Sequence, residues 1–159
     1  MIREYKDSDF EALHRCFCLL QDYERDFEPL RLPADQMADA YLKNIFEKIE
    51  RYKGKIFIAV ADDVEPEEIA GYISLLGRME FDSDLNYTAW IAYVTDLIVL
   101  PEHRKGGTGQ KLIKAAEDYA REQGSSALFL NVLAENKLAR TFYEKEGFKE
   151  YDLRLRKEL

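Results

Sequence analysis

The chain has 159 residues, is 47% hydrophobic and carries a formal net charge of −8 at pH 7. A chain of this length and apolar content predicts one compact domain over residues 1–159, with a core that needs no disulfide or metal. The acidic balance argues against a nucleic-acid-binding protein, because neutralising phosphates requires a basic face. No apolar run approaches the roughly 20 residues of a membrane span, and residues 1–7 lack the apolar stretch of a signal peptide. We therefore expect a cytoplasmic protein that neither spans nor binds a membrane.

The first half of the chain is expected to hold a short strand, two helices and two further strands. Asp7 and Asp9 offer N-caps for the first helix, and residues 28–33, with two prolines, separate it from the second. Tyr41 and Ile45 share one face of that second helix. The predicted elements are a strand over residues 2–5, a helix ending near residue 25, a helix over 34–52, and strands over 56–61 and 69–76.

The second half alternates strands and helices after a long apolar segment. Residues 90–100 are rich in β-branched residues and almost wholly apolar, as in a central buried strand, and Pro101 ends that strand. A helix over residues 107–123, a strand over 127–133, a helix over 136–146 and a strand over 148–156 follow. The predicted order is β-α-α-β-β-β-α-β-α-β, an α/β fold with helices packed on a mixed sheet.

Two cysteines, Cys16 and Cys18, lie two positions apart in the first predicted helix. Side chains at this separation point to different sides of a helix, so we expect reduced thiols and no disulfide. The two histidines, His14 and His103, do not form a second cluster that would complete a metal site. We therefore expect no metal.

The segment Arg-Lys-Gly-Gly-Thr-Gly at residues 104–109 is the most informative part of the sequence, because it joins a predicted strand to a predicted helix. Glycines let successive backbone N–H groups turn toward one point, and the start of the helix adds partial positive charge there. These properties predict a pyrophosphate-binding loop. A Walker loop is excluded by the missing Gly-Lys-Ser/Thr, and a dinucleotide fingerprint by the missing third glycine. A plain strand-to-helix connector remains the alternative.

The pattern R-x-x-G-x-G at residues 104–109 resembles the acetyl-CoA loop of the GNAT superfamily of N-acetyltransferases. A second segment, N-x-x-A-x-x-F-Y-x-x-x-G-F at residues 136–148, resembles the family's motif on the helix after the fifth strand. The two motifs and their separation cover about residues 90–150, and the order of elements agrees along the whole chain. The resemblance implies a GNAT-like α/β (α+β) fold, with four helices and a mixed, mostly antiparallel sheet of six to seven strands.

The resemblance also implies where acetyl-CoA, the expected co-substrate, would bind. Backbone groups of the strand before the loop would pair with the pantetheine arm, and backbone N–H groups of the loop would hold the pyrophosphate. Asn136 would bind the pantetheine or cap its own helix, and both roles can hold at once. The strand positions are Leu97, Ile98 and Val99, and the loop positions are Arg104, Lys105, Gly106, Gly107, Thr108, Gly109 and Gln110.

Two residues are expected to move protons in a direct attack of an amine on the thioester. Tyr143 matches the tyrosine that lies near the cofactor sulfur in many family members, where a phenol can protonate the departing thiolate. Packing of Tyr143 beside Phe142 as a core residue is the alternative. Asp96 is the one acid in the apolar run and is the candidate base, directly or through water. His103 is expected to be a loop residue without a catalytic role.

The acceptor is expected to be a small-molecule or peptide amine of cationic character. Acidic stretches that also carry aromatic residues, at 22–28 and 80–84, suit a cationic amine, although they could equally be solvated surface. Polyamines, aminoglycosides, amino acids and protein N-termini all remain open, as do a longer acyl-CoA donor and a homodimer. The predicted function is an acetyl-CoA-dependent N-acetyltransferase. The alternative is a module of the same fold that binds CoA or a partner without turnover.

Overall fold

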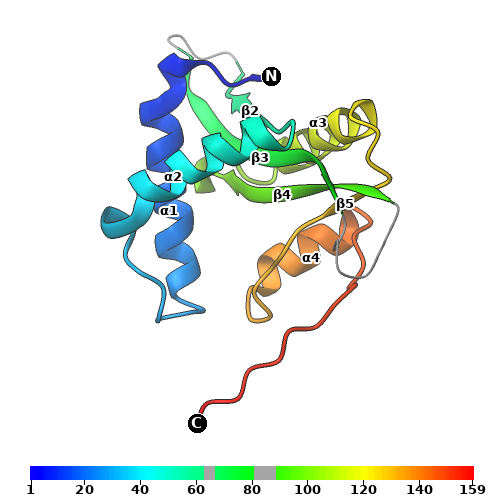
Figure 1. Cartoon of the computed structure of the whole chain (residues 1–159). Coiled ribbons are helices and arrows are strands. Elements are labelled where there is room, and N and C mark those ends of the chain that lie inside the picture. Colours follow the sequence, from blue (N-terminus) through cyan, green and yellow to red (C-terminus); the bar gives the residue numbers. More distant parts are fainter. Residues whose placement is uncertain (63–66, 81–88) are drawn as a thin grey trace.

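The computed structural model describes residues 1–62, 67–80 and 89–159. These residues form four α-helices and five strands (Figure 1). The elements are β1 (Ile2–Glu4), α1 (Phe10–Arg25), α2 (Ala34–Arg51), β2 (Lys55–Val60), β3 (Ile69–Glu80), β4 (Trp90–Val99), α3 (Thr108–Glu122), β5 (Ala127–Phe129) and α4 (Lys137–Lys145). None of the described helices is both long and apolar enough to cross a membrane.

The strands form one sheet in the order β1-β2-β3-β4-β5. The first three pairs are antiparallel, and β5 alone runs parallel to its neighbour β4. Helices α1 and α2 cover one face of the sheet, and α3 covers the other, with α4 beside the β5 edge (Figure 1). The mixed, mostly antiparallel sheet and the four predicted helices are thus confirmed among the described residues.

Helices α1, α2 and α3 each bury one stripe of side chains, as helical periodicity predicts. In α1 the buried residues include Leu13, Cys16 and Phe17, which are three or four positions apart and pack against the sheet. In α3 the corresponding stripe is Leu112, Ile113 and Ala116 on the opposite face. The sheet therefore separates two apolar clusters, and burial of these stripes supplies most of the driving force for folding.

A β-bulge in β4 determines which way the residues after it face. Val94 packs into the cluster under α3, whereas Ile98, four residues later, packs into the cluster under α1 and α2. Residues four apart in a regular strand share a face. Here Ser74 pairs with Asp96 while the next residue of β3 pairs with Val94, so Thr95 is an extra residue in the ladder. The bulge thereby places Asp96 on the face covered by α1 and α2.

The strands β4 and β5 separate soon after they pair. Their register covers only residues 91–93 of β4, and β5 ends at Phe129 while β4 continues to Val99. The predicted strand over residues 127–133 is therefore too long by four residues. Because the bulge follows the paired residues directly, β4 turns away from β5 and a wedge opens between the two strands.

The predicted strand over residues 148–156 is absent, and the expectation of six to seven strands is wrong for the described residues. Leu153 and Leu155 alternate with charged residues, which is a strand-like pattern, yet they are 71% and 89% exposed. A strand requires a neighbour for its backbone hydrogen bonds. In the structure this segment is not a strand: Glu150 pairs with Arg140, Tyr151 packs on Phe129, and the chain then extends away from the body of the molecule (Figure 1).

Candidate active site

The predicted pyrophosphate loop lies between a 3-10 turn, Pro101–His103, and the start of α3. Lys105 and Gly107 have φ values of 67° and 77°, the left-handed region that turns the chain sharply into the helix. The first helical hydrogen bond runs from the Lys111 N–H to the Gly107 carbonyl at 3.0 Å. The N–H groups of Thr108, Gly109 and Gln110 therefore have no partner inside the helix and are oriented for an anion.

Two residues of the loop also have structural tasks. A Cβ on Gly109 would lie 3.0 Å from Cζ of Phe142, so glycine allows α3 and α4 to pack closely. The Arg104 Nε donates a hydrogen bond to the Val99 carbonyl at 2.9 Å, which holds the loop against the end of β4. Lys105 and Gly106 are exposed, and a Cβ on Gly106 would meet nothing within 4 Å.

The positions predicted for the pantetheine arm lie beside the wedge. Leu97, Ile98 and Val99 pair with β3 on one edge, and they lie beyond the last residue that pairs with β5 on the other. Alternate residues of an antiparallel strand direct their backbone groups to opposite edges. The Leu100 N–H bonds the Ala70 carbonyl of β3, so Ile98 also faces β3, whereas Leu97 and Val99 face the other edge. Leu97 has no strand partner on that edge among the described residues, and Arg104 binds the Val99 carbonyl there. An extended ligand with amide groups could pair there as an added strand would.

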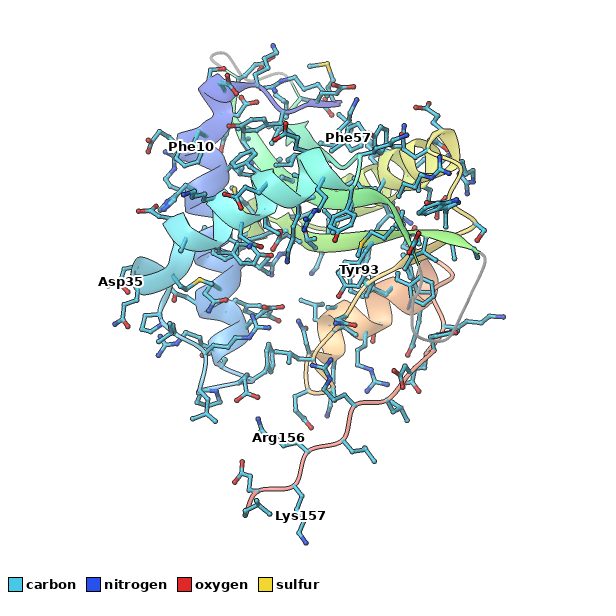
Figure 2. All side chains as sticks on the ribbon, in the orientation of Figure 1. Phe10, Asp35, Phe57, Tyr93, Arg156 and Lys157 are labelled. Carbon is cyan, nitrogen blue, oxygen red and sulfur yellow. The ribbon has the colours of Figure 1, made fainter. Side chains whose placement is uncertain are left out.

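A cavity of about 520 Å³ opens between α1, the segment that follows it, α2, β4 and α4. Its lining includes both predicted catalytic residues, Asp96 from β4 and Tyr143 from α4. Tyr93 also lines it and lies between β4 and α4 in Figure 2. The polar side chains used below are Gln21, Glu24, Arg31, Tyr41, Asp96 and Tyr143.

Asp96 is a buried carboxyl held by two hydroxyl donors. It is 6% exposed, accepts a hydrogen bond from Tyr41 Oη at 2.9 Å, and accepts one from Thr95 Oγ1 at 3.0 Å. Burial raises the pKa of Asp96 to about 6, the two hydroxyl donors oppose that rise, and the charge of Glu24 adds to it. The group is therefore largely ionised at neutral pH and has a pKa in the range suited to accepting a proton.

Tyr41 is a functional candidate that the sequence analysis treated only as part of a helix face. Its ring stacks on Phe17 with centroids 4.4 Å apart and planes at 12°, which fixes the hydroxyl against Asp96. The pKa of Tyr41 is raised by burial and by Asp96, so the phenol remains a hydrogen-bond donor. The sequence does place the Tyr41 phenol among aliphatic residues on the inner face of a helix, which could have marked it as functional. It does not reveal the partner, because Asp96 lies 55 positions away.

Tyr143 packs against aromatic neighbours and also lines the cavity, so its position is compatible with both alternatives predicted for it. Its ring contacts Phe142 and Phe148 at centroid distances of 5.4 and 5.6 Å. Burial, followed by the charges of Glu24 and Asp96, raises the pKa of Tyr143 to about 12. The phenol is therefore protonated at every physiological pH and can act as an acid.

Asn136 lies outside this cavity lining and caps α4. Its side-chain oxygen accepts a hydrogen bond from the Ala139 N–H at 3.1 Å, which is the capping role allowed for it. His103 lies in the 3-10 turn, with Nε2 3.3 Å from Glu68 Oε1, and is likewise outside the lining. Together with Glu102, these two offer three possible ligand atoms within 4.8 Å of one another near the surface.

Both cysteines are free thiols, as predicted. Burial raises the pKa of the Cys16 thiol to about 11 and raises that of Cys18 as well. Neither residue lines the cavity. A thiol with a raised pKa is a poor nucleophile at neutral pH, which agrees with a mechanism that uses no acyl-enzyme.

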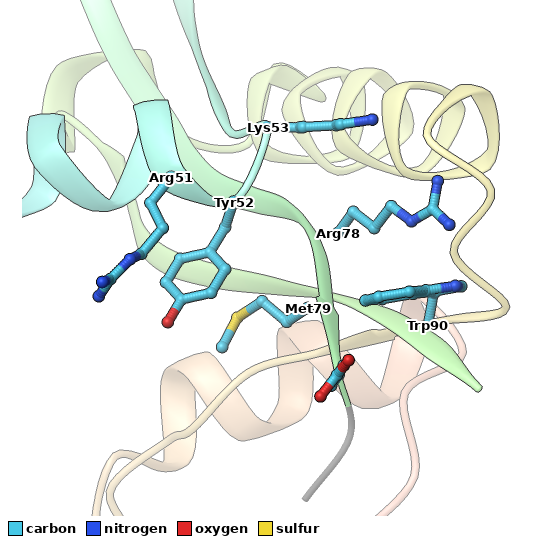
Figure 3. A pocket seen from close by; sticks show the side chains of 7 residues that line it. Arg51, Tyr52, Lys53, Arg78, Met79 and Trp90 are labelled. Carbon is cyan, nitrogen blue, oxygen red and sulfur yellow. The ribbon is translucent and has the colours of Figure 1, made fainter. Parts of the chain in front are cut away.

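A second hollow of about 660 Å³ lies at the other end of β4, near Trp90 (Figure 3). The Arg78 guanidinium stacks on the Trp90 ring at 4.3 Å from its centroid. Figure 3 shows Lys53 and Arg78 pointing to one side while Tyr52 and Met79 point to another. The hollow contains none of the predicted cofactor-binding or catalytic residues. Glu80, predicted to wall the acceptor cleft, lines this hollow and not the cavity, and residues 81–84 of that stretch lie outside the described residues.

Comparison with known sequences identifies the class of protein as an acyltransferase. The chain belongs to the acetyltransferase (GNAT) family, whose sequence model matches residues 16–148. The uncharacterised N-acetyltransferase YhfO of Bacillus subtilis is 32% identical over 149 residues, which cover 94% of this chain and 89% of the relative. The aminoalkylphosphonate N-acetyltransferase of Salmonella typhimurium is 27% identical over 158 residues, which cover 99% of this chain and 90% of the relative. The thialysine N-epsilon-acetyltransferase of Bos taurus is 29% identical over 153 residues, covering 92% and 82%.

Solved structures support the fold. A variant of the BH1408 protein of Bacillus halodurans superimposes with a TM-score of 0.79 at 19% identity, covering 100% of this chain and 99% of the other. AAC(6')-Iy, in complex with the bisubstrate analogue CoA-S-monomethyl-acetylneamine, has a TM-score of 0.68 at 20% identity, covering 100% and 98%. The GNAT-like α/β fold implied by the two sequence motifs is thus confirmed, with five strands among the described residues in place of the six to seven expected.

Proposed function

We propose that this protein transfers the acetyl group of acetyl-CoA to a small primary amine, by direct attack of the amine within a ternary complex. The observation that carries the proposal is that Asp96 and Tyr143, from two elements far apart in sequence, line one cavity beside the wedge between β4 and β5. The family uses acetyl-CoA, and a structural neighbour was solved with a CoA-containing analogue. The reduced thiols fit a cytoplasmic location, and a homodimer stays a prediction.

The chain's residues fit acetyl-CoA at two places. The unpaired N–H groups of Thr108, Gly109 and Gln110 would hold the pyrophosphate, and the exposed Lys105 would add positive charge. The free edge of β4 at Leu97 and the Val99 N–H would pair with the pantetheine amides, while Ile98 keeps its pairing with β3. This arrangement would direct the thioester toward the cavity, where it supplies an activated acyl group.

The incoming amine must lose a proton before or during attack. Asp96 would accept this proton, directly or through a water molecule, and the hydrogen bonds from Tyr41 and Thr95 orient the carboxylate. As the nitrogen–carbon bond forms, the carbon–sulfur bond breaks. Tyr143 would donate its hydroxyl proton to the departing thiolate and would later regain one from solvent. An amine that arrives as an ammonium ion loses two protons in all, one before attack and one as the acetamide forms. Both pass to solvent, the first through Asp96, and solvent returns one to Tyr143. The net products are therefore an acetamide, neutral CoA thiol and one released proton.

The acceptor fits a small amine that arrives as a cation. A cavity of about 520 Å³ is within the range of small-molecule sites, and its acids Glu24 and Asp96 attract an ammonium group. Two relatives are named for aminoalkylphosphonate and thialysine, which are both small amines. A peptide N-terminus entering through the open side of the cavity is the second candidate for the acceptor.

A thiol-release assay with acetyl-CoA and a panel of primary amines tests the proposal. Tyr143→Phe keeps the ring and removes the proton donor, so we expect kcat to fall about 10- to 1000-fold with little change in acetyl-CoA affinity. Tyr93→Phe removes a hydroxyl from the same cavity wall and is the matched control, expected to stay near the wild-type kcat. Binding of acetyl-CoA without thiol release for any amine would instead support the alternative, a binding module.

A further inference from the structure

The connection between α1 and α2 is clamped by polar side chains of α1. The buried Gln21 donates from Nε2 to the Leu32 carbonyl at 2.8 Å, and Arg25 donates from Nε to the Arg31 carbonyl at 3.2 Å. Gln21 and Arg25 are one helical turn apart, so both can bind the backbone of the same segment. The backbone that carries Arg31 is fixed in place before any ligand binds.

The Arg31 guanidinium is held at one end only. Its Nη1 donates to Gln21 Oε1 at 3.2 Å and to Glu24 Oε2. Its Nε and Nη2 make no hydrogen bond to any residue of the described ranges, and the side chain, 35% exposed, lines the cavity. A guanidinium is a planar fork that binds carboxylates and phosphonate-like groups through two parallel hydrogen bonds. The free edge of Arg31 offers such a pair of donors.

The positive charge of Arg31 is unexpected in a cavity that binds an ammonium ion. Among the described lining residues, Arg31 is the one cation, and Glu24 and Asp96 are the two acids. Both acids attract an ammonium group, whereas Arg31 repels it. Arg31 also lies near enough to lower the pKa of Asp96 while Glu24 raises it. A positive group aimed into the cavity is favourable for an acceptor only if that acceptor carries negative charge elsewhere.

We propose that the acceptor is an amine that also carries an anionic oxygen group, a carboxylate or a phosphonate, and that Arg31 binds that group while the amine faces Asp96. This inference rests on the proposed acetyltransferase activity. Gln21 and Glu24 act as positioning residues, because each holds Nη1 and leaves the opposite edge of the guanidinium open. A purely structural Arg31, present only to neutralise Glu24, would give no preference for an anionic acceptor.

The test compares acceptors that differ only in the anionic group. We would measure kcat/KM by thiol release for ω-amino carboxylates of increasing chain length, their carboxamides, the matching alkylamines and the matching ω-aminoalkylphosphonates. At the best chain length, we expect the wild type to favour an anionic acceptor over its carboxamide by about 10- to 100-fold, mainly through KM. The carboxylate and phosphonate series show which anion the fork prefers.

Variants then assign the preference to Arg31. Arg31→Gln should remove the preference by raising KM for the anionic acceptor, whereas kcat/KM for the alkylamine should not fall, because Arg31 repels its ammonium group. Arg31→Lys should retain part of the preference. Arg15→Gln is the matched control, because it removes an exposed cation of the same helix, α1, that does not line the cavity. It should preserve the preference.

The outcomes separate the two claims. Equal kcat/KM for the anionic acceptors and their carboxamides in the wild type would overturn the Arg31 proposal and leave the acetyltransferase standing. So would a loss in Arg31→Gln that is the same for alkylamines and anionic acceptors. No thiol release with any series, despite bound acetyl-CoA, would overturn the proposed function and this inference with it.

Discussion

At the scale of single residues, the proposed chemistry depends on a carboxyl group whose pKa is raised by burial and lowered by hydrogen bonds. Burial raises the pKa of Asp96, and the Tyr41 and Thr95 hydroxyls oppose the rise, leaving it at about 6. A base with this pKa is ionised at neutral pH and still has appreciable affinity for a proton. Tyr41 is thus a positioning residue, because it acts on Asp96 and on no reacting atom.

Tyr41→Phe should change the pH dependence of turnover in a defined direction. Removing the Tyr41 hydrogen bond removes a contact that lowers the pKa of Asp96, so that pKa rises further. Because the base must be ionised to act, the acid limb of the kcat/KM profile should move to higher pH, and activity at the alkaline plateau should change less. Tyr93→Phe is the reference variant for this measurement. If the acid limb of Tyr41→Phe stays at the wild-type pH, Tyr41 does not lower the pKa of Asp96.

At the scale of elements, the sequence predicted contiguous features well and paired features poorly. The loop at residues 104–109 and the cap at Asn136 are local, because glycines, charges and a helix start lie side by side in the sequence. The bulge at Thr95 depends on the register against β3, which no pattern within β4 reveals. The strand predicted over residues 148–156 failed for the same reason, because its alternation was visible but the presence of a neighbouring strand was not.

The packing of α3 on α4 gives a prediction at this scale. Gly109→Ala places a methyl group 3.0 Å from Phe142 Cζ, so the two helices must move apart, and we expect a loss of about 1–3 kcal/mol in the free energy of unfolding. Gly106→Ala is the matched control, since its Cβ meets nothing within 4 Å. Urea unfolding in the absence of cofactor measures the free energy of unfolding of both variants. Equal stabilities would mean that the contact relaxes without cost.

At the scale of the whole molecule, the cavity exists because the sheet opens at one place. Side chains from the α1–α2 layer, such as Tyr41 and Arg31, meet Tyr143 of α4 beside the wedge between β4 and β5. Long segments of chain separate these residues. The sequence could therefore single out Tyr143 from a family motif, Asp96 as the one acid in an apolar run, and Glu24 within the acidic stretch 22–28, whereas Arg31 and Tyr41 required the structure.

The central claim is that Asp96 removes the proton from the amine, and one pair of pH–rate profiles tests it most directly. Folding should survive Asp96→Asn. The raised pKa means that Asp96 contributes stability that is fully present below the unfolded-state pKa of about 3.8 and is lost as pH rises through about 6, so removing its charge does not weaken the fold at neutral pH.

The measurement is kcat/KM against pH for wild type and Asp96→Asn with one amine that the wild type acetylates. If Asp96 is the base, the variant should lose most activity near neutral pH and recover much of it as the pH approaches the pKa of the amine, because free amine needs no base. Parallel profiles, with the same fractional loss at every pH, would contradict the account and remove Asp96 from the proton transfer.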